Sequence, residues 1–126
     1  MTTLHITVDR QAEGFLPGES LSGHVRWDVD GALAALEIRL FWYTAGKGTQ
    51  DVGIVATERL DAPRPSGGRP FRFTLPRTPF SFSGTLISLV WAIELVALPG
   101  AETQRVEFVV SPTRAEVFRP REAAAP

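Results

Sequence analysis

Hydrophobic and polar residues alternate strictly along two stretches of the chain. In residues 21–29 the apolar and small side chains fall on one side of an extended chain, and Ser, His, Arg and Asp fall on the other. Residues 36–43 repeat this pattern, although their second face carries the aromatic residues Phe41 and Tyr43. A period of two is typical of a strand with one buried face. We therefore predict two half-buried strands.

Five further segments have the composition of strands and are bounded by clusters of Gly, Pro, Ser or Asp. They are residues 4–8, 52–60, 71–75, 85–98 and 105–110. Residues 86–98 are long enough for a buried helix, but their Ile, Val and Trp content and the Leu-Pro-Gly turn that follows favour a strand in a hairpin. The 10 prolines and 11 glycines are scattered along the chain and interrupt any long helix. The pattern predicts an all-β fold, an immunoglobulin-like antiparallel β-sandwich of about seven strands.

Length and charge limit what such a sandwich can do. A chain of 126 residues forms one ordinary domain, which we expect to span residues 1–112, followed by a Pro-, Ala- and Arg-rich C-terminal tail at 113–126 that is partly mobile. The 13 basic and 14 acidic side chains give a net charge of −1, so we expect no nucleic-acid partner. The chain has no cysteine, which excludes disulfides and thiolate metal sites.

The N-terminus has no basic start, apolar region or small-residue cleavage site, so we expect a cytoplasmic protein. The longest apolar stretch, residues 86–98, is interrupted by Ser88 and Glu94 and is shorter than the roughly 20 residues that span a bilayer. We therefore expect no membrane insertion. The strong excess of arginine over lysine suggests a GC-rich bacterial genome.

Two ordered motifs resemble those of arrestin-like domains. Residues 15–27 read Phe-Leu-Pro-Gly-Glu-Ser-Leu-Ser-Gly-His-Val-Arg-Trp, similar to the family pattern of an aromatic residue, Pro-Gly-Glu, an aliphatic residue, Gly and Val. Residues 71–93 are similar to the pattern Phe, x, Phe, x, Leu-Pro, then Pro, Ser, an aromatic residue and Gly before a strand with an aromatic residue. Residues 106–110 resemble the closing strand.

In these motifs the chain resembles arrestins, the arrestin-type sorting subunit of retromer, and bacterial sporulation-control proteins. The resemblance covers most of residues 4–110. Eukaryotic arrestins carry two such sandwiches, whereas this chain has the length of one. The residues by which arrestins sense phosphate and activated receptors are therefore not carried over. The resemblance implies a single arrestin-like sandwich that acts in interaction or scaffolding.

Several motif residues have an architectural role. Pro17 presets the φ of a tight turn, and Gly18 accepts the positive φ that the next turn position requires. Glu19 then begins the alternating strand. Gly23 lies on the inward face of that strand and predicts the close approach of a facing group.

The second motif predicts a crossover between strands. Pro76 and Pro79 have no backbone N–H for a strand ladder, so we expect residues 75–80 to link two strands. Gly84 is expected to leave room for a close contact before the long strand at 85–98.

No group of residues predicts catalysis. The two histidines, His5 and His24, have no second imidazole at metal-ligand spacing. Residues 45–49, Ala-Gly-Lys-Gly-Thr, have no glycine four residues before the Gly-Lys pair and no Ser or Thr directly after the lysine, unlike a phosphate-binding loop. No Gly-x-Ser-x-Gly elbow occurs either. We predict a non-enzymatic protein without a cofactor or a metal.

Residues 62–93 contain four arginines and no acidic residue. If Arg64, Arg69, Arg72 and Arg77 converge, they form a site for a phosphate or an acidic peptide through bidentate contacts. The alternative is that scattered arginines only keep a strand edge soluble.

Apolar residues also leave the core face of two predicted strands. They are Phe41 and Tyr43 in the first and Val90, Ala92 and Val96 in the second. Contiguous exposed apolar area is typical of an interface, so this surface predicts a protein partner or a homodimer, which the sheet edges can also form. The alternatives are a register shifted by one residue or a covering loop.

We therefore predict a protein-interaction or scaffold module whose protein partner the sequence does not identify. The alternative is a small-ligand or carbohydrate-binding sandwich. Because Trp27, Trp42 and Trp91 are expected to face inward, Tyr43 is the candidate stacking platform for a sugar.

Overall fold

The computed structural model describes residues 1–46, 50–83, 87–114 and 117–118. The chain forms an all-β sandwich in which strands account for 64% of the residues. The strands are β1 (Thr3–Val8), β2 (Ser20–Asp28), β3 (Ala35–Gly46), β4 (Val52–Asp61), β5 (Ser66–Thr74), β6 (Phe82–Ser83), β7 (Ile87–Leu98), β8 (Glu102–Phe108) and β9 (Val117–Phe118). One short 3-10 helix, η1 (Gln11–Glu13), follows β1.

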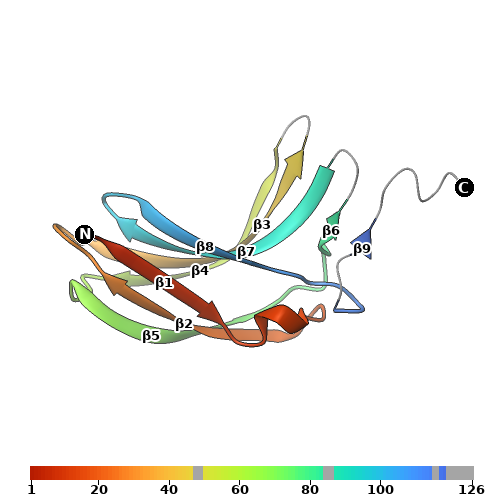
Figure 1. The fold of residues 1–126 in the computed structure, drawn as a ribbon, viewed down its shortest axis with the longest axis horizontal. Helices are drawn as coiled ribbons and strands as arrows, with labels where there is room; N and C mark the ends of the chain where they lie inside the picture. Colours follow the sequence, from red (N-terminus) through yellow and green to blue (C-terminus); the bar gives the residue numbers. More distant parts are fainter. Residues whose placement is uncertain (47–49, 84–86, 115–116, 119–126) are drawn as a thin grey trace, which may run out of the picture.

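The strands form two sheets that lie face to face (Figure 1). The three-stranded sheet has the order β1-β2-β5. The six-stranded sheet has the order β4-β3-β7-β6-β9, with β8 also paired to β7. The named strands pair antiparallel, except for the two-residue strands β6 and β9. An isolated parallel bridge also joins Phe15 to Val110. The predicted antiparallel sandwich is confirmed.

All seven predicted strands are present, and the structure extends several of them. Residues 87–98 form a strand, β7, that pairs with β8 across the predicted hairpin turn, so the helix alternative is wrong. The predicted strand at 71–75 begins earlier, at Ser66, because residues 66–70 continue the ladder with β2. That extension contains Gly67, Gly68 and Pro70, which give no strand signal in the sequence.

The inward faces of the two sheets form one hydrophobic core. The alternation within each strand places its large apolar side chains between the sheets, as predicted. The largest fully buried side chains include Trp91, Phe15, Leu21, Leu36, Ile38, Leu40, Leu75, Ile93 and Leu95. Each such burial contributes about 1.5–3 kcal/mol relative to an exposed side chain. Phe15 packs edge-on against Phe108 with 5.5 Å between ring centroids, which connects the first turn to the last long strand.

The first motif forms a turn that leads into β2, which begins at Ser20, one residue after the predicted Glu19. Gly18 has φ of +82°, and the Glu19 amide donates to the Leu16 carbonyl at 3.1 Å, which closes the turn. A Cβ on Gly23 would overlap the Thr7 carbonyl oxygen and the Phe71 ring, which lie on the two neighbouring strands. Only glycine allows these groups to approach the strand so closely.

The second motif includes the connection between β5 and β6. Pro76 and Pro79 lie between the end of β5 and the start of β6. The Pro79 carbonyl accepts a hydrogen bond from Trp91 Nε1 at 2.9 Å, so the crossover satisfies the one polar atom of a fully buried indole. Gly84 lies outside the described residues.

Part of the segment that we expected to be a tail contacts the sandwich. The Arg114 guanidinium binds the Glu19 carboxylate through two hydrogen bonds of 3.0 and 3.2 Å. Residues Val117–Phe118 pair with β6. The Glu of the Pro-Gly-Glu motif therefore anchors residues close to the C-terminal end of the described chain.

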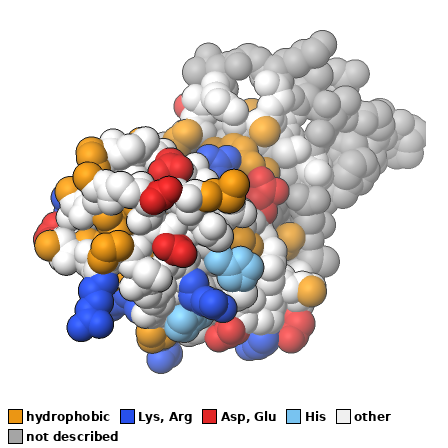
Figure 2. Space-filling model, turned by 60° about the vertical axis from the view of Figure 1, so that its left-hand side comes forward, with side chains coloured by type: hydrophobic (Ala, Val, Ile, Leu, Met, Phe, Trp, Pro, Cys, Tyr) orange, Lys and Arg blue, Asp and Glu red, His pale blue; other side chains and the backbone are white. Residues whose placement is uncertain are grey.

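The surface mixes charges of both signs, and both histidines lie on one face next to basic side chains (Figure 2). These histidines occupy the outer face of the three-stranded sheet, on β1 and β2. Within the described ranges, no helix is long and apolar enough to cross a membrane.

Candidate functional site

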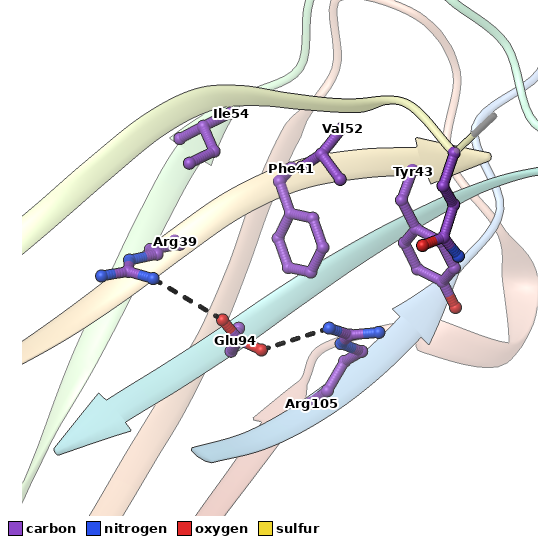
Figure 3. Close-up of a pocket in the computed structure, with 8 residues that line it drawn as sticks. Arg39, Phe41, Tyr43, Val52, Ile54, Glu94 and Arg105 are labelled. Atoms are coloured by element: carbon purple, nitrogen blue, oxygen red, sulfur yellow. Dashed lines mark hydrogen bonds and ion pairs between the residues drawn. The ribbon is translucent and has the colours of Figure 1, made fainter. Parts of the chain in front are cut away.

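The outer face of the six-stranded sheet has a hollow of about 230 Å³ (Figure 3). Strand β3 lines it with Arg39, Phe41 and Tyr43, and the neighbouring strand β4 with Val52 and Ile54. On the other side of β3, one acidic residue of β7 and one basic residue of β8 also line the hollow, and Gln50, just before β4, completes the lining. The hollow therefore combines aromatic, aliphatic and charged side chains from four strands.

The strand register explains why these apolar residues share one face. Phe41 pairs with Ile54, and Tyr43 pairs with Val52. A bulge in β4 opposite the Leu40/Phe41 step inserts one extra residue, Val55, into the ladder. An extra residue reverses the face of everything beyond it, so Val52 and Ile54 lie beside the aromatic rings instead of facing the core.

Gly53 is required between these two residues. It pairs with Trp42 on the inward side of the sheet, and a Cβ on Gly53 would overlap the Trp42 indole ring. The absence of a side chain thus allows the indole to extend under β4 and pack against the core.

A row of ion pairs crosses the floor of the outer face. Glu37 accepts hydrogen bonds from Arg39 at 2.6 Å and Arg59 at 2.7 Å, and these two contacts hold the pKa of Glu37 below its usual value. Glu94 lies between Arg39 at 3.9 Å and Arg105 at 3.3 Å. The cations of the hollow therefore already have carboxylate partners.

Arg105 also covers the aromatic residues. Its guanidinium carbon lies 5.0 Å from the ring centroids of both Phe41 and Tyr43, within the range of a cation–π contact. The Tyr43 hydroxyl donates a hydrogen bond to the Glu107 carboxylate. Burial and, next, this carboxylate raise the pKa of Tyr43.

The predicted apolar surface is only partly exposed. Phe41 and Tyr43 lie on the outer face, as the alternation predicts, so the shifted-register alternative is wrong. However, only 5% of Phe41 and 3% of Val96 is exposed, and the expectation that these two residues are available to a partner is wrong. Arg105 covers Phe41. Tyr43 and Val90 are half-buried.

Among the described strand residues, the exposed large apolar side chains lie one strand further out, on β4. Val52 and Ile54 are each 60% exposed, and Val55 is 40% exposed. In the described part of the chain, β4 pairs only with β3, so its other edge has no strand partner. The sequence identified β4 as a strand, but the exposure of these residues follows from the bulge and the edge position, which alternation does not reveal.

The predicted anion site groups the arginines in and around β5: Arg64, Arg69, Arg72 and Arg77. The structure does not bring them together, because Arg69 and Arg72 are three residues apart on one strand and so point to opposite faces. Arg69 pairs with Glu58 of β4 at 2.9 Å, which links the edges of the two sheets. Arg72 reaches the hydroxyl of Ser20 at 3.3 Å. The other two arginines lie in the loops on either side of β5.

Comparison with solved structures supports the fold. This chain shares its fold with Spo0M. The structure of this sporulation control protein from Bacillus subtilis matches with a TM-score of 0.56 and 16% identity over 87% of this chain and 49% of that one. The chain thus spans about half the length of that protein. An identity this low shows a shared fold and nothing more. That fold is of the arrestin-like kind whose motifs the two segments of this sequence resemble.

Other matches are more distant. The DNA glycosylase AlkC from Pseudomonas fluorescens has a TM-score of 0.45 and 12% identity, over 86% of this chain and 30% of that one. A β-glucosidase from Listeria innocua has a TM-score of 0.49 and 14% identity, over 92% of this chain and 16% of that one. No family model and no curated protein sequence matches the chain.

Proposed function

We propose that this protein is a non-enzymatic, cytoplasmic interaction or scaffold module of arrestin-like fold that holds a partner protein at β4. The observation that carries the proposal is the coincidence of an unpaired strand edge with exposed Val52 and Ile54, next to the hollow formed with Phe41 and Tyr43. An exposed apolar strand edge is a template for pairing with another chain.

The size of the hollow favours a protein partner over a free small molecule. Small-molecule sites usually enclose about 300–1,000 Å³, and this hollow measures about 230 Å³. One large apolar side chain is enough to fill it. Interfaces are commonly anchored by single side chains of this kind that enter a pocket.

The charges around the hollow favour an uncharged partner segment. Arg39 and Arg105 are paired with Glu94, so an acidic side chain would compete with existing ion pairs, and a basic one would meet the two arginines. The half of β4 next to the hollow carries no charged residue. We infer an extended segment that pairs with the β4 backbone and places an aromatic or aliphatic side chain against Ile54.

The carbohydrate alternative has less support on this face. Tyr43 is the only tyrosine in the chain, and the Arg105 guanidinium lies over its ring. Phe41 stacks against the same ring, with 6.0 Å between centroids. A sugar would have to displace one of these neighbours before it could stack on Tyr43.

Site-specific photocrosslinking in cells tests the proposal. A photoreactive amino acid at Ile54 should form discrete protein adducts, whereas the same residue at Thr74, exposed on the other sheet, should not. A Val52→Lys substitution should abolish the adducts, and Thr57→Lys, further along β4, should retain them. An adduct of twice the chain mass would identify the partner as a second copy, the homodimer that the sequence predicts. Identical adducts at Ile54 and Thr74 would refute the proposal.

A further inference from the structure

A second and larger hollow, of about 610 Å³, lies on the outer face of the three-stranded sheet. It belongs to the opposite sheet from the site described above and is independent of the proposed function. Its volume falls within the range of about 300–1,000 Å³ that is typical of small-molecule sites. The residues that line it are mainly polar or charged and come from β1, β2 and β5.

Two adjacent rows of paired residues cross this hollow. In one row His5 of β1 pairs with Arg26 of β2. In the other, Asp28 of β2 lies between Thr3 of β1 and Ser66 of β5. One row is therefore rich in cationic and donor groups, and the other has a carboxylate flanked by hydroxyls. The two charged residues are two positions apart on one strand, about 6.6 Å.

Neither charge has a hydrogen-bonded partner. Among the described residues, the Arg26 guanidinium and the Asp28 carboxylate form no ion pair or hydrogen bond with each other or with another group. The Met1 ammonium, which pairs with Asp30 at 2.7 Å, acts on Asp28 only through its charge. This contrasts with the six-stranded sheet, where Arg39 and Arg105 share Glu94. Two charges of opposite sign in one hollow, neither of them in an ion pair, are the complement of a ligand that carries both signs.

Glycine provides the space beside Arg26. Gly68 of β5 continues the row of His5 and Arg26, and a Cβ on it would lie 3.1 Å from Arg26 Cγ and 3.0 Å from His24 Cε1. Both side chains therefore extend over the glycine. His24 adds a second imidazole on the same face.

We propose that this hollow binds a small zwitterion of the α-amino acid class. Arg26 binds the carboxylate, because its planar guanidinium matches both carboxylate oxygens, and His5 donates a further hydrogen bond. Asp28 binds the ammonium group. A ligand with only one charge is disfavoured, because it meets the like charge of the other residue. Free acids and free amines should bind less tightly than the zwitterion.

Matched ligands test this assignment. Isotope-labelled protein is titrated at constant ionic strength with alanine, N-acetylalanine and alaninamide, and amide chemical shifts are followed by NMR. Alanine should give saturable shifts confined to β1, β2 and β5. Each analogue, which lacks one of the two charges, should bind about tenfold less tightly, the loss expected for one charged hydrogen bond. If N-acetylalanine or alaninamide binds as tightly as alanine, the zwitterion assignment is wrong.

Matched variants test the residues. Arg26→Gln and Asp28→Asn should each weaken alanine binding about tenfold. Arg77→Gln and Asp9→Asn, which remove the same charges from exposed positions elsewhere, should change it less than twofold. All four side chains are exposed, so the variants should keep the fold, which circular dichroism verifies. Equal losses in the control pair, or no saturable shifts with wild-type protein, would overturn the inference without affecting the β4 proposal.

Discussion

Replacing Glu19 with Gln should destabilise the sandwich by breaking the contact that joins the first turn to the C-terminal segment. The Glu19 carboxylate accepts two hydrogen bonds from Arg114 and one from the Leu16 amide at 2.9 Å. Exposed ion pairs contribute up to about 1 kcal/mol, and hydrogen bonds to a charged group about 1.5–3 kcal/mol. Because the side chains of Glu19 and Arg114 are 22% and 34% exposed, we expect a coupling of about 1.5 kcal/mol between them.

A double-mutant cycle measures this coupling. Urea unfolding of the wild type, Glu19→Gln, Arg114→Gln and the double variant gives the four free energies of unfolding. The Glu19→Gln variant should also melt about 6 °C lower, at about 4 °C per kcal/mol for a domain of this size. Arg77→Gln, which removes an exposed and unpaired guanidinium, should leave stability unchanged. A coupling below about 0.3 kcal/mol, within the usual error of additivity, would refute this reasoning.

Acid should weaken the same contact. The Leu16 amide, and then Arg114, lower the pKa of Glu19 from its usual 4.5. A carboxyl group whose folded pKa is lowered stabilises the fold fully above its unfolded pKa and loses that contribution as the pH falls through the folded value. Below pH 4.5 the wild type should therefore lose stability more steeply than Glu19→Gln. If the unfolding free energies of the wild type and Glu19→Gln fell in parallel below pH 4.5, the stabilising role of the ionised Glu19 carboxylate would be contradicted.

Three other predictions concern the six-stranded sheet. Gly53→Ala should cost about 1–3 kcal/mol of unfolding free energy, because its methyl group collides with Trp42; an unchanged urea midpoint would contradict this. The single tyrosine, Tyr43, should ionise above pH 10 in an ultraviolet titration, and Glu107→Gln should lower that pKa by removing the second cause of its shift. Glu37→Gln should flatten the stability curve below pH 4.5, because two arginines lower the pKa of Glu37 in the folded protein.

The strands were predictable because most of them bury one face. Alternation identifies such a strand from its own residues, as in β2 and β3. The first part of β5 was not predictable, because Ser66, Gly67 and Gly68 have low strand propensity and are held in the ladder by pairing with β2. The two-residue strands β6 and β9 are too short to show any period.

The side-chain partners at the candidate site were less predictable. The sequence places Phe41 and Tyr43 on the outer face, but Arg105, which covers them, comes from a strand late in the chain. The four arginines around β5 looked like a cluster in the sequence, yet the pleat separates Arg69 from Arg72. Contacts of this kind depend on which strands become neighbours in space, and local periodicity carries no information about that.

The contrast between the two outer faces has a functional consequence. On the six-stranded sheet most charges are paired and the exposed groups at β4 are apolar, so association there should depend weakly on salt. On the three-stranded sheet Arg26 and Asp28 form no ion pair with another described residue, so binding there should weaken as salt increases. A close-packed core separates the two faces, and neither proposed ligand requires a different arrangement of it. Because coupling between sites requires two states that each ligand distinguishes, occupation of one face should leave affinity at the other unchanged.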